Sequence, residues 1–111
     1  MTAIIDCGMG NVGSILNMLK KIGVDACISS DIGEIEAAAR LILPGVGAFD
    51  NGMRQLEECS MLTVLHKKVI EEQTPILGIC LGMQLMTAGS EEGEVPGLNW
   101  FDAETVRFRD P

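Results

Sequence analysis

Short apolar runs alternate along this chain with segments whose apolar residues recur at helical spacing. The runs that predict strands cover residues 2–6, 24–29, 40–45 and 74–79, and an alternating segment that predicts one more covers 103–108. The first four runs are continuous rather than alternating, as expected for strands that are covered on both faces of a sheet. Residues 91–100 combine two glycines with a proline and predict a loop.

The segments between these runs predict helices. The first has an apolar stripe made of Val12, Ile15, Leu16, Leu19 and Ile22, with Gly23 as its stop signal. Asp31 is a candidate N-cap for a short helix over 31–39. A longer helical segment over 51–72 is expected to break near Ser60, and a further helix is expected over 81–87.

The alternation of strands and helices through residue 88 predicts the fold class. It is α/β, with a doubly wound, mostly parallel sheet, helices on both faces and right-handed crossovers. A chain of 111 residues has room for one domain at most. In such sheets function gathers at the carboxyl ends of the strands, where loops 7–13, 44–51 and 78–82 are expected.

The last of these loops has the sequence GICLG, at residues 78–82. G-x-C-x-G is the cysteine counterpart of the nucleophile elbow, a strained turn that exposes its central side chain above the sheet. Side chains at 78 or 82 would collide with neighbouring backbone. The free N–H groups and positive dipole end of the following helix would favour the thiolate of Cys80. A small buried core cysteine is the alternative, and the position at a strand end favours the nucleophile.

A second glycine-rich segment, LPGVGAF at 43–49, ends another predicted strand. Proline removes one N–H donor, and the two glycines let the backbone take unusual angles. Such a segment can direct backbone N–H groups at a substrate carbonyl oxygen, as an oxyanion hole requires. Taken alone, the segment is more often an ordinary Pro-Gly turn.

Composition and charge narrow the function classes. The formal net charge is −8, and the basic pairs at 20–21 and 67–68 read as solvated helix faces, which argues against nucleic acid as a partner. No apolar run approaches the roughly 18 residues that span a membrane, and the N-terminus lacks the features of a signal peptide. The expected location is therefore the cytoplasm. No cofactor is expected.

The four cysteines, Cys7, Cys27, Cys59 and Cys80, show no C-x-x-C spacing, so neither a zinc site nor a disulfide framework is predicted. The one histidine, His66, is a poor base for Cys80. It lies on a predicted helix that crosses the sheet face, and a structural or solvent-edge role is expected. Without a base, the proton for a leaving group has no obvious source.

The elbow and the LPGVGAF segment together resemble the class I glutamine amidotransferases, the triad glutaminases. The subgroup that the chain most resembles is the glutaminase subunit of imidazole glycerol phosphate synthase, from histidine biosynthesis. The stretches that support this resemblance are IIDCGMGN at 4–11, LILPGVGAF at 41–49, GICLGMQLM at 78–86 and SEEGEVPGLNW at 90–100. They occur in the right order over essentially the whole chain.

The resemblance implies a role for Cys80 as the nucleophile that attacks the side-chain amide of L-glutamine. It implies that the backbone N–H groups of Val46 and Leu81 form the oxyanion hole, with Gly47 shaping that segment. Ammonia would pass to a synthase, or cyclase, subunit in a heterodimer.

Further roles follow from the same resemblance. Gly45, Gly47 and Gln84 would help to hold the substrate, and Asn11 would lie toward the synthase partner. The subgroup usually has tyrosine where this chain has Cys7, so an exposed thiol is expected to replace an aromatic contact there.

Members of the family run to roughly twice this length, with their histidine and glutamate in the second half. Residues 1–111 are therefore expected to be the N-terminal part of a single amidotransferase domain, inactive alone. An incomplete sheet would expose an apolar edge or face, so weak stability or self-association is expected.

Several alternatives remain open. GLNWFDAETVRF at 97–108 is also similar to a paralogous amidotransferase branch that supplies ammonia for amino sugars in surface polysaccharides. A non-catalytic fragment that docks a synthase is a second alternative. GMGNVG at 8–13, with Asp31 further on, fits a dinucleotide-binding loop, although Asp6 would crowd the phosphates. Cysteine-elbow peptidases and chaperone-like proteins usually have histidine after the nucleophile, where this chain has Leu81.

Overall fold

A four-stranded parallel sheet organises the computed structural model, which describes residues 1–107. Its strands are β1 (Thr2–Ile5), β2 (Ala26–Ser29), β3 (Arg40–Gly45) and β4 (Ile76–Cys80), in the spatial order β2-β1-β3-β4. All three pairings are parallel. Each of the first four predicted strands is present, and the fold class expected from the sequence is confirmed.

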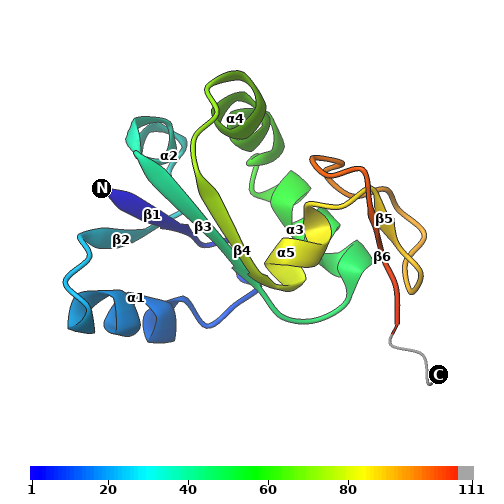
Figure 1. Cartoon of the computed structure of the whole chain (residues 1–111), viewed down its shortest axis with the longest axis horizontal. Coiled ribbons are helices and arrows are strands. Elements are labelled where there is room, and N and C mark those ends of the chain that lie inside the picture. The colour runs from blue at the N-terminus through cyan, green and yellow to red at the C-terminus, as the bar shows by residue number, and fades with distance from the viewer. Residues whose placement is uncertain (108–111) are drawn as a thin grey trace.

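Helices cover both faces of this sheet. The helices are α1 (Val12–Lys21), α2 (Ile32–Ala37), α3 (Phe49–Glu58), α4 (Leu62–His66) and α5 (Leu81–Leu85), and a π-helical turn, η1 (Lys67–Glu71), continues α4. Figure 1 shows α1 on one side of the sheet and α2 and α4 on the other, with α3 and α5 side by side near the end of β4.

Local sequence signals explain where several helices begin and end. The Asp31 carboxylate accepts a hydrogen bond of 2.9 Å from the Glu34 N–H and caps α2, as predicted. The long helical segment breaks where Ser60 takes a φ of 60°, also as predicted. It begins at Phe49, two residues earlier than the pattern indicated, and its π-helical end had no signal in the apolar spacing.

The hydrophobic core lies between the sheet and α2, α3 and α4. It includes Ala3 and Ile5 of β1, Leu41 and Leu43 of β3, Ile35, Leu56, Val64 and Leu65 of the helices, and Met61 at the N-cap of α4. Alternate residues of β1 and β3 point into this layer because successive side chains of a strand face opposite sides. The core therefore fixes the sheet against these helices, and with it the carboxyl ends of the strands.

The opposite face is covered less completely. No residue of α1 is fully buried; Val12, Ile15, Leu16 and Leu19 of its predicted stripe are half-buried, whereas Ile22 of the same stripe is exposed. Leu77, which pairs in register with Ile42, keeps 58% of its surface exposed. The apolar face that the sequence analysis expected is thus present beside β4.

The last part of the described chain forms a separate small sheet. Strand β5 (Gly89–Ser90) pairs in parallel with β6 (Glu104–Thr105). The predicted final strand over 103–108 is therefore shorter than expected and belongs to a second sheet, and residue 108 lies outside the described residues. Residues 91–100 contain no helix or strand, as predicted.

Candidate active site

The three loops expected at the carboxyl end of the sheet do meet there. A Cβ atom built on Gly10 would lie 3.3 Å from the Gly45 nitrogen, so the first loop passes tightly over the end of β3. Gly45 is in turn the register partner of Cys80. The β1–α1 loop, the end of β3 and the start of α5 therefore form one continuous surface.

Cys80 has the backbone of a nucleophile elbow. Its φ is 53° and its ψ is −118°, a combination that residues other than glycine rarely adopt. It ends β4 and directly precedes α5, and its side chain is exposed. Such strain persists only where the surrounding structure imposes it, and it is typical of functional positions.

Gly78 and Gly82 supply the constraint that holds this turn. A Cβ on Gly82 would overlap the carbonyl oxygen of Leu43, and a Cβ on Gly78 would lie 2.6 Å from the Met83 Cα. Both collisions are with backbone, which has little room to move away. The prediction that neither position accepts a side chain is confirmed.

The two predicted oxyanion donors, the N–H groups of Leu81 and Val46, have different backbone surroundings. Leu81 is the first residue of α5, and the N–H groups at a helix start have no carbonyl partner within the helix. The Val46 N–H instead donates to the Met9 carbonyl oxygen at 2.5 Å. Gly47, the next residue, has a φ of 110°. For Val46 to donate to a substrate, the bond to Met9 has to break and the peptide has to turn.

Gln84 lies on α5, one turn after Cys80, and lines a cavity of about 320 Å³. The same cavity is lined by Ser90 of β5, by Glu92 of the loop after β5 and by Arg107 after β6. The Arg107 Nε donates to the Glu92 Oε1 at 2.6 Å. An opposite charge pair beside Gln84 was not predicted, because 15 residues separate the two charges and no short motif contains both.

Asn11 is held as the N-cap of α1, with its side-chain oxygen accepting from the Ser14 N–H at 3.2 Å. It is exposed and lines a second cavity of about 480 Å³, together with Val46, Asn51 and Gln55. The residue proposed for a partner contact thus lies beside the oxyanion segment.

The expectation of an exposed thiol at Cys7 is wrong. Cys7 is buried, with 6% of its surface exposed, and it packs into the core with Cys59 beside it. Burial is the main reason that the pKa of the Cys7 thiol rises well above its usual value, and a hydrogen bond with Cys59 raises it further. Cys7 therefore belongs to the core and offers nothing to a partner's aromatic contact.

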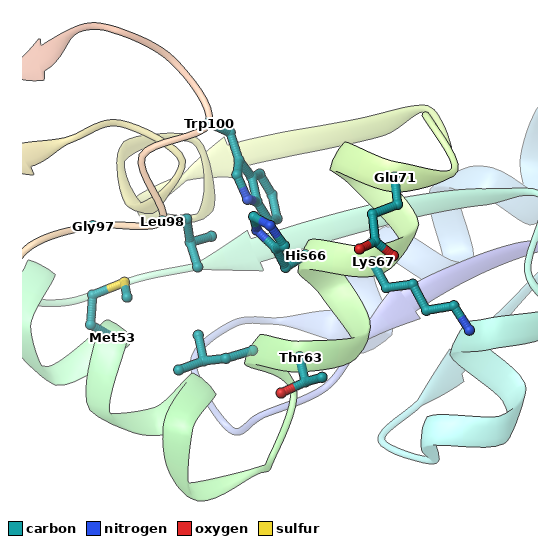
Figure 2. Close-up of a pocket in the computed structure, with 9 residues that line it drawn as sticks. Met53, Thr63, His66, Lys67, Glu71, Gly97, Leu98 and Trp100 are labelled. Carbon is teal, nitrogen blue, oxygen red and sulfur yellow. The ribbon is translucent and has the colours of Figure 1, made fainter.

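His66 lines a different cavity, of about 520 Å³, with Met53, Leu98 and Trp100. Figure 2 shows the Trp100 ring pointing from its loop toward His66 on α4. Cys80 and Gln84 do not line this cavity. His66 and Gln84 thus line different cavities, and the structural or solvent-edge role of His66 stays a prediction.

Two kinds of feature are absent from residues 1–107. No group of three or more His, Cys, Asp or Glu side chains in that part could hold a metal ion. None of its helices has the length and apolar character needed to cross a membrane.

Comparison with known sequences decides the family. Residues 3–104 match the family described as glutamine amidotransferase class-I. The chain belongs to the class I glutamine amidotransferases. The matched range includes the GMGNVG loop and the elbow, so the dinucleotide-binding and peptidase interpretations have no support.

Curated relatives of this amidotransferase chain carry a more specific name. A protein of Methanococcus maripaludis named imidazole glycerol phosphate synthase subunit HisH 2 is 58% identical over 109 residues, which are 98% of this chain and 54% of the relative. A protein of the same name from Pseudomonas aeruginosa is 48% identical, over 97% of this chain and 54% of the relative. The chain spans about half the length of the curated relatives it matches.

A solved structure supports the fold. The match is described as a crystal structure of glutamine amidotransferase, with a TM-score of 0.74 over 95% of this chain and 56% of that structure. The two sequences are 21% identical, so this likeness concerns the fold alone.

Proposed function

We propose that this chain carries the nucleophile of a glutaminase, which hydrolyses L-glutamine to glutamate and ammonia through a thioester on Cys80. The observation that carries the proposal is the backbone of Cys80, with a φ of 53° at the end of β4 and Gly45 as its neighbour. Acyl transfer needs an exposed nucleophile beside backbone N–H donors. Membership of the amidotransferase family supports glutamine as the substrate.

The reaction begins when the Cys80 sulfur attacks the side-chain amide carbon of glutamine. The carbonyl oxygen takes the negative charge of the tetrahedral intermediate, and the C–N bond then breaks. Ammonia leaves with a proton, and a γ-glutamyl thioester remains on Cys80. Water attacks this thioester, which releases glutamate and returns the thiol.

We assign the stabilisation of the oxyanion to the N–H groups of Leu81 and Val46. The Leu81 N–H lies at the start of α5, where the helix itself supplies no carbonyl partner for it. The Val46 N–H reaches the oxyanion only after it leaves the Met9 carbonyl, and the positive φ of Gly47 supports such a turn of the backbone. Loss of one oxyanion donor typically lowers the rate by about a hundred- to a thousand-fold, so this rearrangement would control activity.

The cavity beside Gln84 suits the amino-acid end of glutamine, with its ammonium and carboxylate groups. Glu92 and Arg107 offer the opposite charge to each of them. These two side chains now pair with each other, and both are largely exposed. Because exposed ion pairs contribute little stability, exchanging the pair for contacts with a zwitterion costs little.

Ammonia departure and thioester hydrolysis both need a group that moves protons. The one histidine of the chain, His66, lines a cavity other than the one beside Gln84. We assign this role to a residue of the part of the curated relatives that this chain does not match, which is about half of their length. Residues 1–111 alone should then give no steady-state turnover, and measurable ammonia release by that polypeptide would contradict the assignment.

We further propose that the ammonia passes to a synthase subunit, in a cytoplasmic heterodimer that forms imidazole glycerol phosphate for histidine biosynthesis. The names of the relatives support this acceptor. The exposed Asn11 and the cavity beside Val46 are our candidates for the surface that faces the partner. Co-purification with an amino-sugar synthase would reject the histidine pathway and leave the glutaminase proposal intact.

An electrophilic glutamine analogue tests the proposed nucleophile in the full-length protein. Peptide mass spectrometry should find the analogue on Cys80, and Cys80→Ser should abolish both labelling and glutaminase activity. Cys59→Ser is the matched control, because that half-buried thiol packs against the core. Labelling at another cysteine, or normal activity of Cys80→Ser, would show that the assignment is wrong.

A further inference from the structure

Asp50 joins two parts of the chain that are far apart in sequence. It lies in the first turn of α3, and its carboxylate accepts hydrogen bonds from two backbone N–H groups of the loop after β5. The Glu94 N–H lies 3.0 Å from Oδ1 and 2.9 Å from Oδ2, and the Val95 N–H lies 3.1 Å from Oδ1. Hydrogen bonds to an ionised acceptor are roughly twice as strong as neutral ones.

The loop that Asp50 holds carries a side chain of the proposed substrate cavity. Ser90 and Glu92 line that cavity, and Glu94 follows two residues later. The Gly93 N–H donates to the Ser90 carbonyl oxygen at 3.1 Å, which closes a tight turn directly before Glu94 and Val95. A shift of the Glu94 backbone would therefore move Glu92 with it.

Gly93 lies against the clamp, by which we mean the hydrogen bonds from the Glu94 and Val95 amides to the Asp50 carboxylate. A Cβ on this residue would be 2.5 Å from the Asp50 Oδ1 and 3.2 Å from the Phe49 Cδ1. Any side chain at position 93 would push the loop away from α3. The close approach explains why glycine suits this position without any appeal to an unusual φ.

Asp50 is itself fixed relative to the nucleophile. It follows the LPGVGAF segment by one residue, so its backbone continues the chain that carries Val46. The same first turn of α3 packs on α5, since a Cβ on Gly52 would lie 3.0 Å from the Leu81 Cδ2. Asp50 thus connects the Glu92 loop to the frame that holds Cys80 and the oxyanion segment.

We propose that Asp50 is a positioning residue for glutamine, which holds Glu92 at the Gln84 end of the site by clamping the Glu94 and Val95 amides. This inference rests on the proposed glutaminase function. Asp50 touches no reacting atom in this role. Its loss should therefore weaken capture of the substrate while the chemical step at Cys80 continues.

The test measures inactivation of the full-length protein by the electrophilic glutamine analogue, with KI for capture and kinact for reaction at Cys80. Asp50→Ala should raise KI about tenfold or more, since several charge-assisted hydrogen bonds are lost, and should change kinact less than about threefold. Asp50→Asn keeps one acceptor oxygen and should fall between. Glu58→Gln, an exposed acid at the end of the same helix, is the matched control and should match the wild type.

The outcomes separate the two proposals. If the wild-type protein is not labelled at Cys80, the glutaminase function fails whatever Asp50 does. If it is labelled and KI of Asp50→Ala equals that of the wild type, the positioning role fails. Where Asp50→Ala does not fold, an unchanged KI in Asp50→Asn overturns the proposal instead.

A double-mutant cycle with Gly93→Ala gives a readout that a general loss of stability would not mimic. Gly93→Ala alone should raise KI, because its methyl group displaces the loop from Asp50. In the Asp50→Ala background it should add little, because the clamp is already gone. Additive effects on KI would contradict the proposed contact.

Discussion

Gly45 and Cys80 are register partners at the last pair of the β3–β4 ladder, so the oxyanion segment and the nucleophile leave the sheet side by side. A Cβ on Gly45 would lie 3.2 Å from both the Gly82 nitrogen and the Leu81 Cβ. The end of β3 therefore contacts the start of α5 directly. Parallel pairing brings together two segments that are 35 residues apart (80 − 45), and this pairing positions the chemistry.

Gly82→Ala should be strongly destabilising, because its methyl group would overlap the Leu43 carbonyl oxygen in the centre of the sheet. Overpacking of this kind costs about 1–3 kcal/mol and sometimes more, and here the obstacle is backbone. Urea denaturation of the full-length protein should show a lower midpoint. Gly89→Ala is the matched control, since a Cβ there meets nothing within 4 Å. Equal midpoints for the two variants would contradict the close approach of α5 to β3.

The elements of the main sheet could be predicted because their signals are local. The continuous apolar runs predicted all four strands of that sheet, and G-x-C-x-G at 78–82 predicted the elbow. The glycines at both ends of that motif were also predictable, since a strained turn between a strand and a helix leaves no space for a Cβ.

Long-range contacts had no such signal. Nothing in the sequence indicated that the Asp50 carboxylate would bind amides 44 and 45 residues away, or that Arg107 would reach Glu92. The Val46 N–H was expected to contribute to the oxyanion hole, and its bond to the Met9 carbonyl depends on how two loops cross. Such crossings are set by tertiary packing, and residue type alone does not report them.

Lys68→Met should destabilise the protein, because the predicted solvated face at 67–68 is wrong for this lysine. Lys68 lies on the π-helical turn with 4% of its surface exposed, and its Nζ donates to the carbonyl oxygens of Glu36 and Ala38 at 2.8 Å each. These carbonyls end α2 and have no further helical partner. Leaving them unsatisfied should cost about 2–4 kcal/mol.

The neighbouring residue provides the control for this prediction. Lys67→Met removes the same charge from an exposed position of the same turn and should shift the urea midpoint far less. The salt bridge between Lys68 and Glu72, at 3.7 Å, adds little because Glu72 is exposed. If the two lysine variants have the same stability, the buried hydrogen bonds do not hold the end of α2.

The buried Cys7 thiol should make the free energy of unfolding fall at high pH. Burial raises its pKa in the folded state above the 9.0 of an exposed thiol. Above about pH 9 the unfolded chain therefore loses this proton while the folded chain keeps it. The contribution of Cys7 to the free energy of unfolding is fully present below about pH 9. Above that pH it declines by at most about 1.4 kcal/mol per pH unit.

Cys7→Ala removes the thiol and should make the free energy of unfolding fall less steeply with rising pH. The variant is also expected to be less stable at every pH, so the slopes are compared and not the absolute values. The comparison isolates Cys7 from the lysines and from Cys27, whose pKa is also raised by burial. Unfolding is measured by denaturant titration between pH 7 and 10.5 under reducing conditions. The same pH slope in both proteins would show that Cys7 ionises normally in the folded state.

The polypeptide of residues 1–111 should self-associate through the sheet face beside α1. Leu77 on β4 is 58% exposed, and Met18 and Ile22 at the end of α1 are 65% and 68% exposed. Strand β4 is also an edge of the sheet, with one neighbour, β3. An apolar face next to an open strand edge favours pairing between chains. Sedimentation velocity should show a weight-average mass that rises with concentration.

Leu77→Lys should shift this equilibrium toward monomer, because a charge on the apolar face cannot be buried between two copies without a large cost. Val95→Lys makes the same change at an exposed residue of the 91–100 loop and should leave association unchanged. A sharp thermal transition that is monomeric and independent of concentration in the unsubstituted polypeptide would contradict the prediction. Unchanged association of Leu77→Lys would show that the contact between copies lies on another surface.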